Sequence, residues 1–486
     1  MSHTIEQLEP SAVWRQFAAL SAVPRPSKKE DKAVALVRDF GQELGLDTGV
    51  DKLGNVIIRK PATPGMEDRL SIVLQGHLDM VHQKNAGTEF DFDHDGIRMR
   101  LDGDWVSADG TTLGADNGIG VASIMAILAS KDIPHPAIEA LFTIDEESGM
   151  TGALGLRAET LAGSILLNLD TEDDTELTIG CAGAVNVLAC GTYGPVQVVA
   201  EDVAFILRIG GLVGGHSGMD IHRGRANANK LLNRLLFLAA ERFDLRIGSI
   251  DAGGLRNAIP REAQAHVTVS ASEIEAFRDF VAQQVVVLRS EYAVTDPDLE
   301  LRLEPADPPS SLLPHDFQQG LLSAVYACPN GVFRLSPAIE GLVQTSNSMA
   351  RVQAADGKYE INCLVRSAVD SEKMDLATAI RCTFEPIGAS VELSGSYPGW
   401  TPRPEAPIVK LMSGLYQEMF GEKPSVLACH AGLECGILGA SHPDMQMISF
   451  GPNIRGAHSP DERVQISSVQ KFWRFLLATL ERIPTK

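Results

Sequence analysis

The sequence has little of three things that would each indicate a particular class of protein. Among 486 residues there are seven cysteines, and no two of them form a C-x-x-C pair. This argues against a disulfide framework or a thiolate zinc site and favours a reducing cytoplasm. No apolar run approaches the roughly 18 residues that a membrane-spanning helix needs. Basic residues are scarce, with 42 Lys and Arg against 63 Asp and Glu and a formal net charge of −21. A nucleic-acid or anionic-membrane partner is therefore not expected, since clustered basic side chains bind phosphate.

A secretory signal is not expected either. The first ten residues carry Glu6 and Glu9 and lack a basic stretch that leads into an apolar one. With 44% hydrophobic and 22% charged residues, the composition is that of a soluble globular protein. A chain of this length exceeds one ordinary core, so we expect two or three domains and a cytoplasmic location.

The first half alternates predicted strands and helices. Short apolar runs of strand length cover 55–59, 71–75, 137–144 and 165–169, and helices are predicted at 12–20, 29–44 and 118–129. Strands separated by helices predict an α/β domain with a mostly parallel sheet. Such sheets place their chemistry beyond the carboxyl ends of the strands.

The middle of the chain differs in pattern. Strands are predicted at 203–209, 264–270, 360–366 and 390–394, with helices at 228–240 and 273–288, which favours a smaller α+β domain. The last part returns to a helix at 407–420, a strand at 445–450 and a helix at 469–481. We therefore expect a discontinuous α/β domain, 1–186 with 398–486, that carries an inserted domain at 187–397. No internal repeat is visible.

Acidic residues and histidines follow the predicted strands. His77 and Asp79 form an H-x-D pair after 71–75, so Asp79 is able to reach either the His77 ring or a metal behind it. The strand at 137–144 runs into Asp145, Glu146 and Glu147, which would repel one another without a cation. Adjacent side chains point apart, so one Glu can bind metal while its neighbour faces an attacking water.

Three further positions complete the pattern. Asp116 stands at the start of the predicted buried helix, where an ordinary helix cap is the alternative interpretation. Asp170 follows 165–169, and His458 follows the strand at 445–450. Each motif is weak alone, but their shared position at strand ends is informative. Imidazole and carboxylate ligands without thiolate suit zinc or manganese, and this number of ligands suits two metals bridged by one carboxylate.

These residues resemble a known family. Gly76-His77-Leu78-Asp79, Gly114-Ala115-Asp116-Asn117-Gly118, Asp145-Glu146-Glu147 and Asp170 look like the metal-ligand series of the M20 metallopeptidases. Further segments resemble its bacterial aminoacyl-histidine dipeptidase branch, and they are 214–218 (GGHSG), 256–260 (RNAIP), 430–436 (HAGLECG) and 456–460 (GAHSP). The resemblance spans nearly the whole chain.

The resemblance implies a role for each position of the cluster. His77 and Asp170 would hold one metal, Glu147 and His458 the other, with Asp116 bridging the two ions. Asp79 would orient His77, and Glu146 would be the general base. The Asp116–Asn117 peptide would be cis. The two divalent ions would be Zn²⁺, with Mn²⁺ or Co²⁺ as alternatives, and the inserted domain would be a lid that also forms a homodimer interface.

Four residues of the inserted and final segments are candidates for substrate binding. The resemblance makes His216 an oxyanion donor, in some members across a dimer, whereas a His in a glycine-rich loop is usually just exposed. Asn257 is a weaker candidate of the same kind. Arg366 would pair with a substrate carboxylate or form a surface ion pair. Glu434 would receive a substrate ammonium or be an ordinary helix-start carboxylate. His82, His94, His222 and His430 are interpreted as structural.

The leading hypothesis is a di-zinc dipeptidase for unblocked dipeptides, including Xaa-His substrates. An aminoacylase on the same framework is the close alternative, and the two differ in whether a free amino end is recognised. A non-catalytic binding protein is a third hypothesis, but it predicts loss of a ligand or of the base, and none of these residues is missing.

Overall fold

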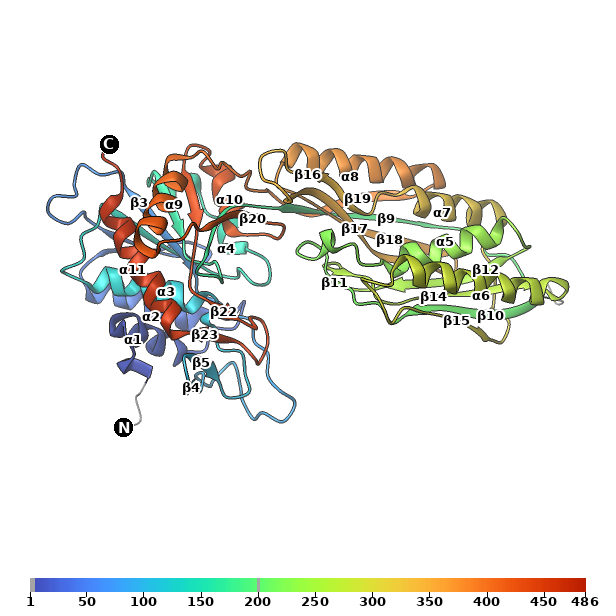
Figure 1. The fold of residues 1–486 in the computed structure, drawn as a ribbon, viewed down its shortest axis with the longest axis horizontal. Helices are drawn as coiled ribbons and strands as arrows, with labels where there is room; N and C mark the ends of the chain where they lie inside the picture. Colours follow the sequence, from blue (N-terminus) through green and yellow to red (C-terminus); the bar gives the residue numbers. More distant parts are fainter. Residues whose placement is uncertain (1–4, 199–201) are drawn as a thin grey trace. The chain divides into compact units, whose positions relative to one another are not determined.

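The computed structural model describes residues 5–198 and 202–486, which form two compact units (Figure 1). Unit 1 comprises Met1–Gly180, Trp400–Ala428 and Leu433–Lys486, and unit 2 comprises Cys181–Gly399 with Cys429–Gly432. Unit 1 is therefore discontinuous in sequence. Within the described ranges, none of the helices combines the length and the apolar character that crossing a membrane requires.

Unit 1 is built on an eight-stranded sheet in the order β1-β2-β6-β3-β7-β21-β8-β20. The strands are β1 (Asp47–Val50), β2 (Val56–Lys60), β6 (Ile138–Thr143), β3 (Ile72–His77), β7 (Ile165–Asn168), β21 (Gln446–Ser449), β8 (Glu176–Cys181) and β20 (Ser425–Cys429). The four central strands β6, β3, β7 and β21 are parallel, whereas β1, β2 and β8 pair antiparallel. The predicted α/β class is confirmed, and the sheet is mixed towards its edges.

Strands β3 and β7, in the middle of the sheet, are buried along their whole length, which explains why they read as continuous apolar runs. Helix α3 (Ala115–Ala129) packs against β3 and against α1 (Ser11–Ser21), and nearly all of its side chains are buried. The remaining helices of unit 1 are α2 (Asp31–Glu43), α4 (Thr151–Leu154), α9 (Pro407–Phe420), α10 (Glu434–Ser441) and α11 (Ile466–Arg482). A smaller sheet, β22-β23-β5-β4, is formed by Ile454–Arg455, Arg463–Gln465, Trp105–Ala108 and Met99–Asp102.

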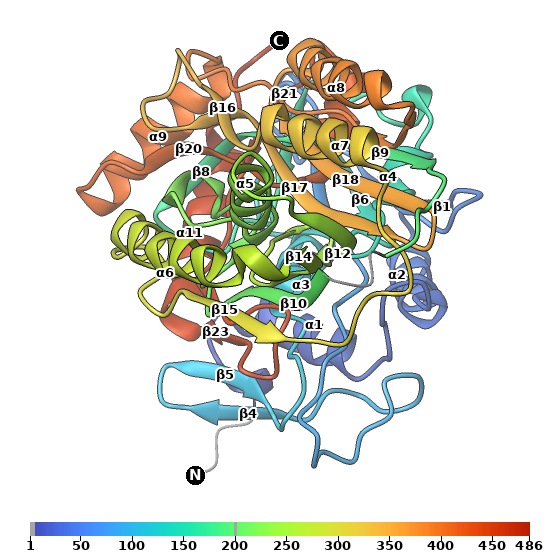
Figure 2. The ribbon, with the colours of Figure 1, turned by 90° about the vertical axis from the view of Figure 1, so that its right-hand side faces the viewer.

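Unit 2 contains a long antiparallel sheet in the order β15-β10-β14-β12-β17-β18-β9-β19, with β16 (Gly331–Leu335) paired to β17. The strands are β15 (Glu300–Pro305), β10 (Asp202–Gly210), β14 (Ala263–Ser270), β12 (Arg246–Gly253), β17 (Val343–Ala355), β18 (Lys358–Ser367), β9 (Gly183–Thr192) and β19 (Ser390–Tyr397). The helices are α5 (Ala228–Ala240), α6 (Ile274–Glu291), α7 (His315–Ala327) and α8 (Asp370–Phe384). They lie side by side in the order α6, α5, α7, α8 (Figure 2) and share one apolar core with the sheet.

Unit 2 contains two modules in which strands and helices are connected in the same order. The succession β10-α5-β12-β14-α6-β15 places its four strands in the order fourth, first, third, second. The succession β9-α7-β17-β18-α8-β19 places its strands in the same order, with the first module inserted after β9. The two modules join where β12 pairs antiparallel with β17, from Ile250 opposite Ala354 to Gly253 opposite Arg351. The sequence shows no such repeat because the fold requires matching apolar periodicity and not matching residues.

The chain enters and leaves unit 2 at neighbouring positions. A Cβ placed on Gly183, the first residue of β9, would lie 2.5 Å from the backbone nitrogen of Gly399 and 2.5 Å from the carbonyl oxygen of Tyr397. Only glycine permits this approach of two backbones. The two ends of the main segment of unit 2, Cys181–Gly399, therefore lie side by side.

Candidate metal centre

The parallel strands of unit 1 deliver acidic and imidazole side chains to one edge of the sheet. His77 is the last residue of β3, Glu146 and Glu147 follow β6, and Asp170 follows β7. Asp116 comes from the start of α3, where its own φ and ψ angles are not helical. The carboxyl ends of parallel strands meet at one edge, so residues far apart in sequence come together there.

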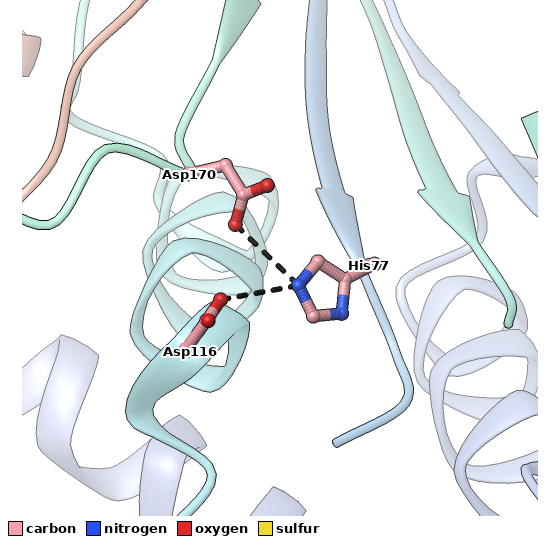
Figure 3. Close-up of side chains that lie close together, drawn as sticks. All are labelled: His77, Asp116 and Asp170. Carbon is pink, nitrogen blue, oxygen red and sulfur yellow. Dashed lines mark hydrogen bonds and ion pairs between the residues drawn. The ribbon is translucent and has the colours of Figure 1, made fainter. Parts of the chain in front are cut away.

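Asp116 lies between the two histidines. Its Oδ1 is 3.2 Å from His77 Nε2 and its Oδ2 is 3.3 Å from His458 Nε2. On the His77 side, Asp170 Oδ1 lies 3.4 Å from the same ring nitrogen, so two carboxylates from different elements face one imidazole atom (Figure 3). On the other side, Glu147 Oε2 lies 3.0 Å from His458 Nε2. The arrangement is two groups of side chains able to hold a metal ion, and the groups share one carboxylate.

The backbone around Asp116 is held in an unusual form. The peptide bond between Asp116 and Asn117 is cis, as the resemblance implied. Gly114, which precedes the helix, has a positive φ of 70°, and a Cβ there would lie 2.6 Å from Arg25 Nη2. A side chain at this position would be strained by both conformation and space, which accounts for the glycine.

Asp79 connects two of the loops. The His77 Nδ1 atom lies 3.1 Å from the Asp79 carbonyl oxygen and 3.3 Å from Asp79 Oδ1, so Nδ1 donates to Asp79 and Nε2 is the ring atom that faces Asp116 and Asp170. The Asp79 carboxylate also accepts the backbone N–H groups of Glu146 at 3.0 Å and Glu147 at 3.2 Å. One buried side chain thus orients an imidazole and fixes the turn that carries both glutamates.

The acidic turn after β6 is stabilised within itself. Asp145 has a positive φ of 53°, and its carboxylate accepts hydrogen bonds from the hydroxyls of Ser148 at 2.9 Å and Thr151 at 2.7 Å. Asp145 therefore points back into the turn. The neighbouring Glu146 and Glu147 take part in the cluster with His77.

Burial of so many carboxylates shifts their ionisation. Burial raises the pKa of Asp170 to about 7. Burial also raises the pKa of Glu146 well above its ordinary value, and the negative charges of Asp170 and Glu147 raise it further. Burial opposes ionisation of Asp116 as well, but hydrogen bonds from His458 and His77 hold its pKa well below the usual range. Hydrogen bonds to Asp116 and Glu147 raise the pKa of His458 to about 11.

The residues present fit divalent cations. Three groups have ligand atoms within 4.8 Å of one another, and they are His77 with Asp116 and Asp170, His77 with Glu146 and Glu147, and Asp116 with Glu147 and His458. The buried oxygens Glu147 Oε1 and Asp170 Oδ1 have no hydrogen-bond partner. Five carboxylates, those of Asp79 and the acidic members of the three groups, meet two imidazoles, so positive charge is needed to balance them. Oxygen and nitrogen donors without sulfur suit zinc or manganese.

The predicted substrate-binding residues of unit 2 are arranged as follows. His216 lies in the short strand β11 (Gly215–His216), opposite Ala258 of β13 (Ala258–Ile259), and the exposed Asn257 precedes that partner. Arg366 of β18 is 5% exposed, and its Nη2 lies 3.5 Å from His216 Nε2. His216 and Arg366 therefore lie together within unit 2.

Arg366 is buried without a counter-charge. Its Nη1 donates to the Tyr397 hydroxyl at 3.3 Å, its Nε has no hydrogen-bond partner, and across residues 5–198 and 202–486 it forms no ion pair. The surface ion pair considered from the sequence is therefore wrong. A buried unpaired guanidinium is costly unless it serves an anion.

Glu434, at the start of α10 in unit 1, is 1% exposed. Its Oε2 accepts hydrogen bonds from Gln75 Nε2 and Thr143 Oγ1, both at 2.6 Å, while its Oε1 has no partner. Burial raises the pKa of this carboxyl to about 8. It is thus more deeply enclosed than an ordinary helix-start carboxylate.

Comparison with known proteins agrees with this geometry. The family model of peptidase family M20/M25/M40 matches residues 73–482. The chain is 42% identical over 482 residues to the cytosol non-specific dipeptidase of Escherichia coli (strain K12), which covers 99% of each chain.

The chain belongs to peptidase family M20/M25/M40.

Solved structures agree with this M20 membership. The crystal structure of aminoacylhistidine dipeptidase from Vibrio alginolyticus has a TM-score of 0.93 at 43% identity, covering 100% of this chain and 99% of that one. The aminopeptidase PepT from Bacillus cereus, with a TM-score of 0.56 at 16% identity, covers 98% and 99% of the two chains and shares the fold. The M20 resemblance and the α/β fold with an inserted domain are confirmed.

Two residues at this M20 centre were missed by the sequence analysis. Arg25 and Glu462 are buried charged side chains, 1% and 2% exposed, that contact the backbone of the ligand-bearing loops. A signal for Glu462 exists, because it stands four residues after His458 in the motif HSPDE. Nothing in the local sequence marks Arg25.

Proposed function

We propose that this M20 peptidase is a metal-dependent dipeptidase that hydrolyses unblocked dipeptides. The observation that carries the proposal is the Asp116 carboxylate, which faces His77 through one oxygen and His458 through the other. Each half of this arrangement has a further carboxylate, Asp170 or Glu147. Its relatives from Escherichia coli and Vibrio alginolyticus are named dipeptidases, which supports the same class of reaction here.

In this proposal His77 and Asp170 hold one ion, Glu147 and His458 hold the other, and Asp116 bridges them. Zn²⁺ is the ion proposed, with Mn²⁺ or Co²⁺ as alternatives, because the donors are nitrogen and oxygen. When bound, two divalent ions polarise the scissile carbonyl and lower the pKa of a water molecule. Asp79 keeps the His77 ring in the tautomer that ligation needs.

Glu146 is the proposed general base. Its backbone is fixed by Asp79, and it lies in the cluster with His77 and Glu147. Burial raises its pKa well above the ordinary range of a carboxyl, which suits a group that must accept a proton near neutral pH. Glu146 takes the proton from the attacking water and returns it to the leaving amine.

Unit 2 is proposed to supply groups that recognise the substrate. His216 Nδ1 accepts the backbone N–H groups of Gly218 at 3.2 Å and Met219 at 3.0 Å, so in the neutral ring the proton is on Nε2. Burial, with the charge of Arg366 beside it, lowers the pKa of His216 to about 4, which keeps the ring neutral. The Nε2–H of His216 and the guanidinium of Arg366 are thus neighbouring donors.

Two neighbouring donor groups without a counter-charge suit oxygens of a substrate. We assign the Nε2–H of His216 to the developing oxyanion and Arg366 to the carboxylate at the C-terminus of the dipeptide. Asn257 is a weaker candidate of the same kind, since its carbonyl oxygen accepts the N–H of Ser217 next to His216. Glu434, with one unpartnered oxygen, is assigned to the free ammonium group.

The remaining proposals concern substrate range and setting. Xaa-His dipeptides are proposed substrates because a relative of high similarity is named aminoacylhistidine dipeptidase. A cytoplasmic location is proposed because a relative is named a cytosol dipeptidase. Homodimerisation through unit 2 is proposed, and the exposed apolar side chains of β16 (Val332, Phe333 and Leu335) offer a surface for it. Sedimentation of the purified chain measures the oligomeric state.

A substrate panel tests the function. Purified protein supplied with Zn²⁺ or Mn²⁺ is assayed on free dipeptides, including β-alanyl-histidine, and on N-acetyl amino acids. The proposal expects cleavage of the dipeptides. Cleavage confined to the N-acetyl compounds would identify an aminoacylase, and no cleavage of any compound would support a binding protein.

A further inference from the structure

Two buried charged residues hold the backbone of the metal-binding loops from opposite sides. Glu462 lies between β22 and β23, and Arg25 lies between α1 and α2. Neither is a member of the candidate ligand groups. Both are almost completely enclosed, at 2% and 1% exposed.

The Glu462 carboxylate accepts four consecutive backbone N–H groups. Oε2 accepts from Leu113 at 2.7 Å and Gly114 at 2.8 Å, and Oε1 accepts from Ala115 at 2.7 Å and Asp116 at 3.2 Å. These are the N–H groups at the start of α3, which have no partner within the helix. A negative charge is favoured there by the helix dipole as well. Glu462 therefore fixes the backbone of the proposed bridging ligand.

Arg25 ties this loop to the one that carries His77. Its Nη1 donates to the carbonyl oxygens of Leu78 and Asp79, both at 3.0 Å, and its Nη2 donates to Gly114 at 2.5 Å. The backbone N–H of Met80 returns a hydrogen bond to the Arg25 carbonyl at 3.1 Å. One guanidinium thus holds two loops that come from different strands.

The contacts form one continuous hydrogen-bond network. Glu462 holds the loop at 113–116, Arg25 joins that loop to Asp79, and Asp79 accepts the N–H groups of Glu146 and Glu147. Glu462 also shares its own loop with His458, and its N–H donates to Ser459 at 3.0 Å. Every proposed ligand except Asp170 thus lies on a segment that Glu462, Arg25 or Asp79 contacts or belongs to.

We propose that Glu462 and Arg25 are positioning residues that set the distance between the two proposed metal sites and thereby govern metal affinity. The proposal rests on the metal centre of the proposed function. Neither residue touches substrate in it. Groups that orient metal ligands in this way typically contribute about 10–100-fold to metal affinity.

The test compares metal affinity among folded variants. E462Q keeps the size of the side chain but turns an –NH₂ group towards backbone N–H groups, so the loop at 113–116 loses acceptors. We expect about a 10–100-fold weaker Zn²⁺ affinity in competition with a chromogenic chelator. We also expect faster hydrogen exchange at Leu113 and Ala115, and activity that recovers as Zn²⁺ is raised.

A matched control is Glu139→Gln. Glu139 also accepts two backbone N–H groups, those of Ala162 and Gly163 at 2.8 and 2.9 Å, but at the start of β6, away from the proposed ligands. This control should lose stability without losing Zn²⁺ affinity. Unchanged Zn²⁺ affinity in folded E462Q would overturn the proposal, as would an equal loss in both variants.

A second variant tests whether the two residues act together. In R25K an ammonium group replaces the guanidinium, which donates to three backbone carbonyl oxygens on two loops. The loss of Zn²⁺ affinity in the double variant should be smaller than the product of the two single losses, since both act on one support. Fully multiplicative losses would contradict joint action. If E462Q does not fold, R25K and E462D are compared with Glu139→Gln in the same affinity assay.

These outcomes separate the inference from the proposed function. Failure of the wild-type protein to cleave any dipeptide would remove the dipeptidase assignment. The ratio of Zn²⁺ affinities between wild type and E462Q is measured without substrate and is independent of that result.

Discussion

At the scale of single residues, the centre depends on side chains that each make more than one contact. Asp116 presents one oxygen to His77 and one to His458. Asp79 faces the His77 ring and accepts two backbone N–H groups of the glutamate turn. A substitution that keeps only one of these contacts is therefore expected to disrupt the proposed metal centre, even where the size of the side chain is preserved.

The general base provides the first prediction. Glu146→Ala should lower kcat by about 10²–10⁴-fold, because proton transfer loses its acceptor while the proposed ligands keep theirs. Steady-state kinetics on a cleaved dipeptide measures kcat, and elemental analysis of the same sample measures bound metal. Loss of metal together with activity would instead make Glu146 a ligand, and retained activity would remove its role as base.

A second prediction concerns pH and unit 2. His430 is buried, its Nε2 lies 2.7 Å from the Ser346 hydroxyl, and it is faced by the guanidinium of Arg366 and the rings of His216 and His222. Burial, with Arg366 next in importance, lowers the pKa of His430 to about 3. The folded ring stays neutral where the unfolded ring binds a proton, so its contribution is complete above pH 6.5 and is lost as the pH falls towards 3.

Between pH 7 and pH 4 this one group should reduce the free energy of unfolding by roughly 3 kcal/mol. His430→Gln should flatten that part of the pH dependence. Urea unfolding of both proteins at pH 7, 6, 5 and 4 measures it. Equal slopes in the two proteins would show that the ring is not kept neutral.

The residues of the centre could be anticipated because of where they stand in the sequence. His77, Asp170 and the glutamates follow apolar runs that are recognisable as strands, and parallel strands end at one edge. Their roles as ligands and base remain predictions. Arg25 could not be anticipated, because its partners are backbone atoms of distant loops, and backbone contacts leave no trace in residue types. For Glu462 the sequence offers only its place four residues after His458.

At the scale of elements, agreement is best where apolar periodicity is strong. The bounds of α5 and α9 match the predicted helices at both ends, and the central strands of unit 1 match within one or two residues. Strand β17 was missed because its buried positions 344–348 carry the polar sequence QTSNS. Its side chains are satisfied by neighbours such as Glu372, which accepts from Thr345 at 2.8 Å, and such partners are visible only in the fold.

Helix α11 provides a prediction at this scale. Phe475 is 3% exposed and packs against the rings of Tyr416 and Phe420 of α9 and of Phe450 after β21. Phe475→Ala should lower the free energy of unfolding by about 3–5 kcal/mol, because the ring is lost and a cavity is left. Chemical denaturation measures it. Val294→Ala, at a side chain that is 95% exposed, is the control and should change stability little.

At the scale of the whole molecule, the two units differ in what metal does for them. All proposed ligands belong to unit 1, whereas the apolar core of unit 2 lies among its own helices and sheet. A ligand that binds only the folded state stabilises it in proportion to the logarithm of its concentration. Metal should therefore stabilise unit 1 alone.

Removal of metal tests this difference. With Zn²⁺ a thousandfold above its Kd, unit 1 should be about 4 kcal/mol more stable than in a chelator. Differential scanning calorimetry with EDTA and with added Zn²⁺ should shift one transition and leave another in place. A shift of the entire unfolding profile by the same amount would mean that the units unfold as one.

The close approach of Gly183 and Gly399 has a consequence for how such a protein arises. A module whose two ends are neighbours can be spliced into a surface turn of another domain without stretching its host. Ancestral recombination could therefore exchange the whole insert as a cassette. The proposed metal ligands of unit 1 would then be inherited separately from His216 and Arg366, which belong to the insert.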